Sequence, residues 1–129
     1  APDIIHCHGW LTALVPLYIR KYYHDDPLFA QSKVVYSVYD DEFAGALNKN
    51  FRKKLLLKGI SGADVKVLEN PTYVNVSKLA VQYADAVVKG SREIHPELGQ
   101  FIGESGKKFL DYQEKEVYID AYNDFYDKV

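Results

Sequence analysis

The sequence predicts an α/β fold, an open and doubly wound sheet of about four parallel strands. Short runs of β-branched and aromatic residues alternate along the chain with longer segments of helical periodicity. The clearest strand, residues 33–39 (KVVYSVY), is apolar at nearly every position, which is typical of a parallel strand covered on both faces. The 129 residues suffice for one domain, and no linker, repeat or low-complexity run divides them.

The first half of the chain supplies two strands and two helices. Residues 4–7 indicate a short buried strand. Residues 10–23 carry apolar side chains at helical spacing, but Pro16 lies inside the pattern, so this helix is expected to kink or to begin late. After the strand at 33–39, residues 50–58 predict a basic amphipathic helix with a solvated charged side.

The second half continues the alternation. Its expected elements are, in order, a helical turn at 64–68, a helix opened by residues 71–73, a strand at 85–90, a helix from Pro96 closed by Gly106, a strand at 108–111 and a final helix at 114–129. Strands that alternate with helices are joined by right-handed crossovers and lie parallel. The apolar runs 4–5, 34–38 and 86–88 are expected to be central and buried. Ligands of such sheets bind beyond the carboxyl ends of the strands, so the loops there are the candidate sites.

Composition excludes several classes of protein. The net charge is −2 and the pI about 6.1, so no basic surface for nucleic acid is expected. No apolar run reaches the roughly 18–20 residues of a membrane span, and the single cysteine cannot form an internal disulfide. A cytoplasmic location is expected. The chain lacks methionine and starts close to a strand, so we expect a piece of a longer protein; removal of an initiator methionine is the alternative.

His6, Cys7 and His8 follow one another at the end of the first strand. On a strand the two histidines face one side and the cysteine the other, and zinc requires three or four converging ligands, so no metal site is predicted. His6 is expected to be hydrogen-bonded inside the sheet, and Cys7 to be a buried, inert thiol. For His8 two interpretations stay open: the same structural role, or contact with a polar ligand at the mouth of the strand.

The loops after the second and third strands carry the other candidates. Asp40 directly follows a strand end and is a candidate for a cation or a sugar hydroxyl, whereas Asp41 and Glu42 are expected to be solvated. Ser91 is expected to cap the next helix rather than to meet a ligand. No phosphate-binding glycine motif and no G-x-S-x-G motif occurs, so no cofactor is predicted.

Three blocks of the sequence carry a family resemblance: residues 2–18 (PDIIHCHGWLTALVPLY), 33–40 (KVVYSVYD) and 78–91 (KLAVQYADAVVKGS). In order and spacing they resemble the blocks P-D-x-x-H-x-H-D-W, K-x-V-x-T-x-H-N and K-x-x-x-x-x-x-D-x-x-x-x-V-S of the glycogen/starch synthase family. The resemblance covers roughly residues 2–91, and the segment after Ile94 matches no block of the family.

The resemblance implies a fold, a reaction and partners. Enzymes of this family have two Rossmann-like domains facing across a cleft, and they transfer glucose from ADP- or UDP-glucose to an α-1,4-glucan with retention. The N-terminal domain contacts the acceptor and the C-terminal domain binds the nucleotide sugar. By resemblance, residues 1–129 form a single partial Rossmann-like domain, the second half of the N-terminal domain. An α-glucan, glycogen or maltooligosaccharide, is then the expected partner, a nucleotide sugar would require the second domain, and an unpaired sheet edge is a candidate surface for self-association.

Two departures from the family pattern fall on its active-site blocks. Gly9 stands where the family has an acidic residue before Trp10, and Tyr39 stands where it has the histidine of H-N, with Asp40 in place of the asparagine. A tyrosine cannot act as a neutral imidazole does near pH 7. No catalytic residue is therefore assigned, and the isolated chain is expected to transfer no glucose. The alternatives are a non-catalytic glucan-binding or regulatory module derived from this domain, and an unrelated α/β domain.

Four residues are predicted to contact substrate: His8, Trp10, Tyr39 and Asp40. The ends of adjacent parallel strands lie about 5 Å apart, so these side chains are expected to gather at the carboxyl edge of the sheet. His8 and Asp40 are expected to bond sugar hydroxyls, while Trp10 or Tyr39 offers a flat face to a pyranose ring. The alternative for Trp10 is that it anchors the first helix in the core.

Overall fold

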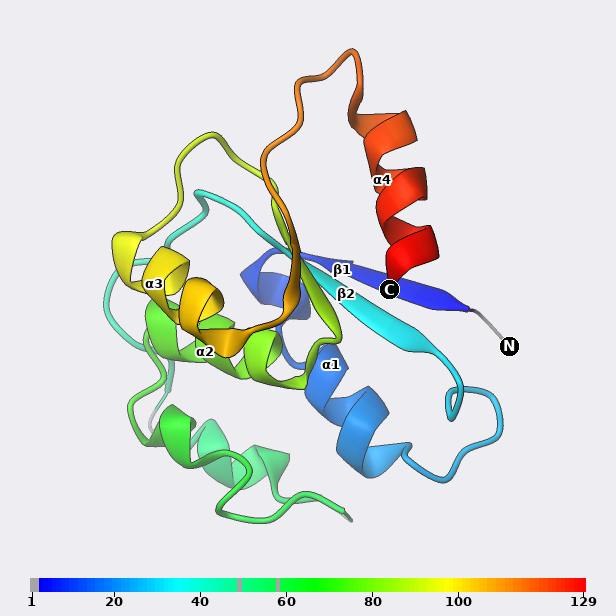
Figure 1. Ribbon diagram of the computed structural model, residues 1–129. Coiled ribbons are helices and arrows are strands. Elements are labelled where there is room, and N and C mark those ends of the chain that lie inside the picture. The colour runs from blue at the N-terminus through cyan, green and yellow to red at the C-terminus, as the bar shows by residue number, and fades with distance from the viewer. Residues whose placement is uncertain (1–2, 49, 58) are drawn as a thin grey trace.

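The computed structural model describes residues 3–48, 50–57 and 59–129. Pro2 of the first family block and Lys58, at the end of the predicted basic helix, lie outside the described residues. The described chain forms a sheet of four parallel strands, arranged in the order in which they occur along the sequence (Figure 1). The strands are β1 (Ile4–His8), β2 (Lys33–Val38), β3 (Ala86–Lys89) and β4 (Lys108–Leu110). The predicted open parallel sheet is confirmed.

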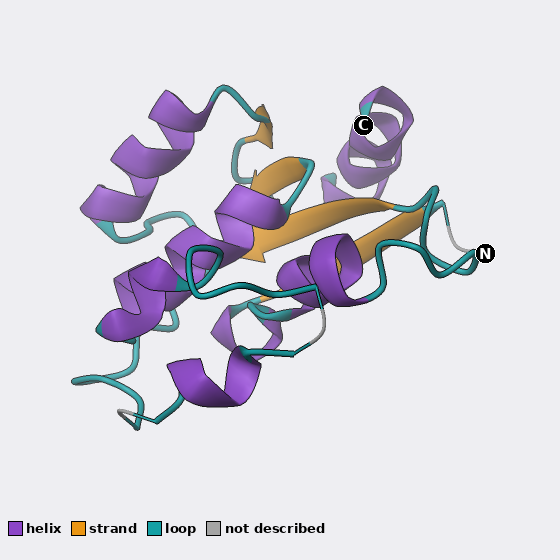
Figure 2. Cartoon of the chain, turned by 90° about the horizontal axis from the view of Figure 1, so that it is seen from below, coloured by secondary structure: helices purple, strands orange, loops and turns teal. Residues whose placement is uncertain are grey.

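Helices cover both faces of this sheet, as predicted for a doubly wound fold. They are α1 (Val15–Leu17), α2 (Tyr73–Tyr83), α3 (Pro96–Ser105) and α4 (Tyr118–Lys128). Because each new strand is added on the same side of the last, right-handed crossovers place α1, α2 and α3 on one face. Helix α4, which follows the last strand, lies across the strands from α1 and α2 (Figures 1 and 2).

The larger part of the core lies between the sheet and helices α1 to α3. Tyr36 and Val38 of β2 are buried there together with Leu79 of α2 and Leu98 of α3. Val34 lies on the same side, and since side chains alternate along a strand, Val35 and Ser37 face the other side of the sheet. Every residue of β2 after Lys33 is buried, as expected for a strand covered on both faces.

A smaller core lies on the opposite face, beneath α4. Val35 of β2 packs there with Phe125, the buried residue of α4. The strand register pairs His6 with Val35 and His8 with Ser37, so these two histidines and the serine share the α4 face. Polar side chains therefore stand between the apolar contacts of this smaller core and the carboxyl edge of the sheet.

Two helices begin at the residues that the sequence indicates. Thr72 caps α2, because its Oγ1 accepts a hydrogen bond of 3.2 Å from the N–H of Asn75. Helix α3 begins at Pro96, whose missing N–H costs nothing in a first turn. It ends at Gly106, where a φ of 70° favours glycine.

The first predicted helix is broken into three short pieces. A 3₁₀ turn (Trp10–Thr12) precedes α1, and a π-helical turn (Tyr18–Tyr22) follows it. Pro16 lies at the start of α1, in agreement with the prediction that a proline inside this segment delays the helix. The expected kink or late start is therefore confirmed, and three short pieces take the place of one continuous helix.

Two other helices are shorter than expected. The predicted basic helix is reduced to a 3₁₀ turn at Arg52–Leu55, in which Leu55 alone is buried. One buried side chain is too little packing to offset the cost of ordering a longer helix. The final helix begins at Tyr118 rather than at residue 114, because residues 111–117 carry the chain from β4 to the opposite face of the sheet (Figure 1).

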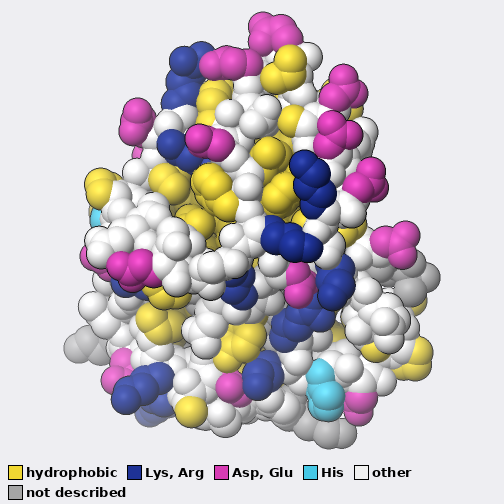
Figure 3. All heavy atoms as spheres, in the orientation of Figure 1, with side chains coloured by type: hydrophobic (Ala, Val, Ile, Leu, Met, Phe, Trp, Pro, Cys, Tyr) yellow, Lys and Arg dark blue, Asp and Glu magenta, His cyan; other side chains and the backbone are white. Residues whose placement is uncertain are grey.

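Strands β1 and β4 form the two edges of the sheet in the described part of the chain. Residues 34–38 and 86–88 are buried as predicted, but Ile4 and Ile5 are only half-buried, because β1 has a single strand neighbour. Phe109 of β4 is 43% exposed, and hydrophobic side chains gather between α3 and α4 on the face shown in Figure 3.

Among the described residues, no helix combines the length and apolar character needed to cross a bilayer.

Candidate functional site

The ends of β1 and β2 bring two of the predicted residues into contact. His8 is the last residue of β1 and Tyr39 follows β2, and a hydrogen bond of 2.7 Å joins His8 Nδ1 to the Tyr39 hydroxyl. Burial lowers the pKa of His8. Burial also raises the pKa of Tyr39, an effect that the Ser37 hydroxyl partly offsets and the Asp41 charge increases. Near neutral pH the pair is therefore an uncharged imidazole bonded to an uncharged phenol.

Two glycines make room for the Tyr39 ring. A Cβ atom at Gly90, after β3, would lie 2.5 Å from Cε1 of that ring, closer than real contacts allow. A Cβ atom at Gly9 would lie 3.8 Å from Cδ2 of the ring and 2.7 Å from a carboxylate oxygen of Asp41, and Gly9 has a φ of 75°. The ring thus lies across the carboxyl ends of three neighbouring strands, and the glycines on both sides define its position.

Asp41 belongs to the site, although the sequence predicts that it is solvated. The buried Tyr73, at the start of α2, donates from its hydroxyl to Asp41 Oδ1 (2.8 Å) and to the Tyr39 carbonyl (2.7 Å). Burial and the bond to Asp41 raise the pKa of Tyr73 well above its usual range. The expectation for Asp41 was wrong because a buried hydroxyl requires an acceptor, and the carboxylate is turned inward to supply it.

Trp10 lies on the other side of Asp41. Its backbone N–H donates to Asp41 Oδ2 over 3.3 Å. Its half-buried ring packs on Phe43, with ring centroids 4.6 Å apart, and joins the main core. This packing agrees with the alternative that Trp10 anchors the first helix, and it leaves part of the indole exposed at the carboxyl edge.

Asp40 is exposed, and its backbone N–H donates to Ser91 Oγ over 3.0 Å. Ser91 therefore ties the loop after β3 to the loop after β2. The expectation that Ser91 caps α3 was wrong: the cap is His95, whose Nδ1 accepts from the N–H of Glu97. Helix α3 begins at Pro96, so His95 is the residue whose side chain can reach the free N–H groups of the first turn.

His6 has the structural role that the sequence predicts. Hydrogen bonds join its Nε2 to Ser37 Oγ (2.6 Å) and its Nδ1 to the Tyr126 hydroxyl of α4 (2.5 Å). Its ring stacks on His8 with centroids 4.0 Å apart and planes 17° from parallel. Burial, and to a smaller extent the nearby His8, lowers the pKa of His6 to about 4.

Cys7 points to the opposite face of β1 and is buried. Burial raises the pKa of its thiol to about 11, so it stays protonated and inert, as predicted. Within residues 3–48, 50–57 and 59–129, no three His, Cys, Asp or Glu side chains are grouped so that they could hold a metal ion.

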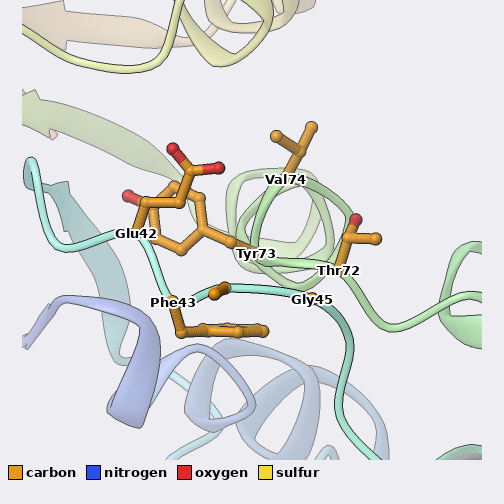
Figure 4. Close-up of a pocket in the computed structure, with 7 residues that line it drawn as sticks. Glu42, Phe43, Gly45, Thr72, Tyr73 and Val74 are labelled. Carbon is orange, nitrogen blue, oxygen red and sulfur yellow. The ribbon is translucent and has the colours of Figure 1, made fainter.

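A hollow of about 430 Å³ opens beside Asp41, at the start of α2. In Figure 4, Phe43 lies on one side of it and Val74 on the other. Its lining residues are Glu42, Phe43, Ala44, Gly45, Thr72, Tyr73 and Val74. The volume is in the range of small-molecule sites, and the hollow shares Tyr73 with the hydrogen bonds of Asp41.

Comparison with known proteins assigns the chain to a family. Residues 1–112 match the family described as starch synthase catalytic domain. The chain belongs to this family. The resemblance carried by the three sequence blocks is thereby confirmed. The starch synthase match includes β1 to β4 and every predicted site residue, and it ends before α4.

Glycogen synthases are among the relatives of this starch synthase family member. The chain is 36% identical over 106 residues to the glycogen synthase of Desulfitobacterium hafniense, covering 77% of this chain and 22% of that protein. It is 30% identical over 114 residues to that of Photobacterium profundum, covering 88% and 22%. It is 35% identical over 91 residues to the glycogen synthase of Chlorobium luteolum, covering 70% of this chain and 18% of that protein. The chain thus spans about a fifth of the length of these relatives.

Proposed function

We propose that this chain is the acceptor-side part of a glucosyltransferase of the starch synthase family. In this proposal the whole protein transfers glucose from ADP- or UDP-glucose to an α-1,4-glucan, and this part contacts the glucan. The observation that carries the proposal is the His8–Tyr39 hydrogen bond at the carboxyl edge of the sheet. Parallel α/β sheets bind their ligands at this edge, and both residues lie within the matched region.

The proposed glucan-contacting residues are His8, Trp10, Tyr39 and Asp40. An uncharged imidazole and phenol suit sugar hydroxyls, because each both donates and accepts hydrogen bonds. The exposed Asp40 carboxylate adds an acceptor, and the exposed part of Trp10 offers an apolar surface to a pyranose ring. A few hydrogen bonds and one stacked ring correspond to a dissociation constant of roughly 1 mM.

A second candidate function is a non-catalytic glucan-binding or regulatory module derived from the same domain. The observation that favours it is the environment of Tyr39. Its phenol has a pKa raised by burial, so it neither gains nor loses a proton near pH 7 as an imidazole does. In both candidate functions the edge of the sheet binds glucan, and they differ in whether the parent protein turns over.

Binding is tested by NMR titration of the chain with maltoheptaose up to about 10 mM, above the expected dissociation constant. Shifts confined to the four proposed residues and their neighbours are expected. Cellohexaose, a β-1,4-linked glucan, is the matched control and should cause smaller shifts. No shift at the highest maltoheptaose concentration would contradict both candidate functions.

Turnover is tested separately with radiolabelled ADP-glucose and UDP-glucose and glycogen as acceptor. We expect no incorporation by the isolated chain, because it spans only about a fifth of the length of the glycogen synthases that it matches. Incorporation by the full-length parent protein supports the glucosyltransferase, and its absence in a parent that binds maltoheptaose supports the module. Incorporation by the isolated chain above a no-protein control contradicts the assignment of this chain to the acceptor side.

A further inference from the structure

We propose that Tyr126, on helix α4, is a positioning residue for the His8–Tyr39 pair and acts through His6. The four side chains form a continuous series on one face of the sheet. The Tyr126 hydroxyl bonds His6 Nδ1 (2.5 Å), the His6 ring stacks on His8 (4.0 Å), and His8 Nδ1 bonds the Tyr39 hydroxyl (2.7 Å). Each link is a direct contact, so the position of α4 is transmitted to the carboxyl edge of the sheet.

His6 is held at both of its ring nitrogens. One bonds Tyr126 on α4, and the other bonds Ser37, which is fully buried in β2. A neutral imidazole has one donor and one acceptor nitrogen, so both of its hydrogen-bonding groups are used. The ring cannot turn about its Cβ–Cγ bond without breaking a bond to the helix and a bond to the sheet.

His8 is exposed, and it takes its orientation from its neighbours. Stacking on His6 orients the plane of its ring, and the bond to Tyr39 directs Nδ1. When the Tyr39 hydroxyl donates to Nδ1, the proton of the neutral imidazole sits on Nε2. His8 then presents one N–H in a defined direction, which suits an oxygen atom of a ligand such as a sugar hydroxyl.

Helix α4 lies outside the region that the starch synthase family matches, which ends at residue 112. The family match therefore includes His6, His8 and Tyr39 but not the helix that contacts His6. A role for Tyr126 goes beyond the family assignment. The positioning rests on geometry alone, and its consequence for glucan binding rests on the proposed function.

The first test is Tyr126→Phe in the 129-residue chain, which removes one hydroxyl and keeps the ring. With ¹⁵N-labelled histidine, NMR reports the ring nitrogens of His6 and His8. We expect the His8 signals to shift and broaden, and the midpoint of its titration to rise toward the ordinary value as α4 loosens. The matched control is Tyr118→Phe, two turns earlier on the same helix, where the side chain is 41% exposed. It should leave the His8 signals in place.

A double-mutant cycle tests whether Tyr126 acts through His6. His6→Phe keeps a flat ring beside His8 and removes both hydrogen bonds. If the path is correct, adding Tyr126→Phe to His6→Phe changes the His8 signals no further. Circular dichroism verifies that each variant is folded. If one single variant does not fold, the His8 signals of the other still test whether His8 depends on His6 and Tyr126. Unchanged His8 signals in Tyr126→Phe, or additive effects of the two substitutions, would overturn the proposal.

Maltoheptaose distinguishes this proposal from the proposed function. In a chain that binds it, Tyr126→Phe should weaken binding about fivefold, equivalent to one neutral hydrogen bond. Altered His8 signals in a chain that binds no maltoheptaose support the positioning and contradict the proposed function alone. Maltoheptaose binding with unaltered His8 signals in Tyr126→Phe contradicts the positioning alone.

Discussion

The ring of Tyr39 lies against the backbone of Gly90 so closely that a Cβ atom at residue 90 would stand 2.5 Å from ring carbon Cε1. A ring at this position therefore requires a residue without a side chain at residue 90. The hydroxyl of the same ring bonds His8, so Gly90 helps to hold the His8–Tyr39 pair at the carboxyl edge of the sheet.

Gly90→Ala should displace the Tyr39 ring and break its bond to His8. Overpacking of this kind lowers the free energy of unfolding by about 1–3 kcal/mol, which urea denaturation measures. The matched control is Gly103→Ala, inside α3, where a Cβ atom meets nothing within 4 Å. It should be neutral or stabilising by up to about 1 kcal/mol, because alanine favours helix. Equal effects of the two substitutions would show that the ring moves aside freely.

Gly9→Ala should cost more than Gly45→Ala, although both glycines have a positive φ, 75° and 68°. At Gly9, where φ is 75° and ψ is 174°, the backbone lies in a region essentially restricted to glycine, so alanine is strained there by about 1–3 kcal/mol. At Gly9 the new Cβ also lies 2.7 Å from the Asp41 carboxylate, whereas at Gly45 it meets nothing within 4 Å. We expect a further loss of about 1–2 kcal/mol for Gly9→Ala. Thermal unfolding of the two variants measures the combined cost of the Gly9 backbone conformation and the contact with Asp41, and equal melting temperatures would argue against both.

Tyr73→Phe should destabilise the loop after β2. The substitution removes the hydroxyl that donates to Asp41 and to the Tyr39 carbonyl, and it leaves both acceptors without that donor. Loss of one partner of a buried hydrogen bond costs about 1–3 kcal/mol. The exposed Tyr22, changed to phenylalanine, is the control and should unfold like the unchanged chain. A negligible loss in Tyr73→Phe would mean that water satisfies Asp41.

Most elements of the fold could be predicted from patterns of neighbouring residues. The elements that were predicted wrongly depend on contacts between residues far apart in the sequence. The apolar run at 34–38, the opening residues 71–73 and Pro96 each predict their element from a few neighbouring residues, and the structure agrees with all three. The segment 10–23 shows the limit: its periodicity and Pro16 predict a helix that kinks or begins late, but not the 3₁₀ and π-helical turns on either side of α1.

Only those site residues that lie at the ends of strands could be predicted from the sequence. His8 and Tyr39 were placed together because the ends of parallel strands meet. Asp41 was misjudged because its partner Tyr73 is 32 residues away, and Tyr126 was missed because it is 120 residues from His6. Helical periodicity predicts the helix that contains Tyr126 but carries no information about which strands that helix covers.

The free energy of unfolding should fall as the pH is lowered from about 6.5 to about 4, because of His6. Burial, with a smaller contribution from His8, lowers the pKa of His6 from 6.5 to about 4. Between these values the unfolded chain binds a proton that the folded chain does not, so stability rises with pH and is complete above about 6.5. After allowance for partial exposure of the ring, the loss is about 2 kcal/mol. Urea denaturation at pH 7, 5.5 and 4.5 measures it.

Two histidine variants identify the group responsible for this pH dependence. His6→Gln keeps an amide that can bond Ser37 but cannot take up a proton, so its stability should vary less between pH 7 and 4.5 than that of the unchanged chain. His24→Gln alters an exposed histidine in the loop after the π-helical turn and should keep the full dependence. Protonation of His6 turns its one accepting ring nitrogen into a donor, so the hydroxyl that donated to it, of Ser37 or Tyr126, must rotate to accept instead. The same loss of stability in both variants would assign the pH dependence to another group, either His8, whose pKa burial also lowers, or the carboxylates.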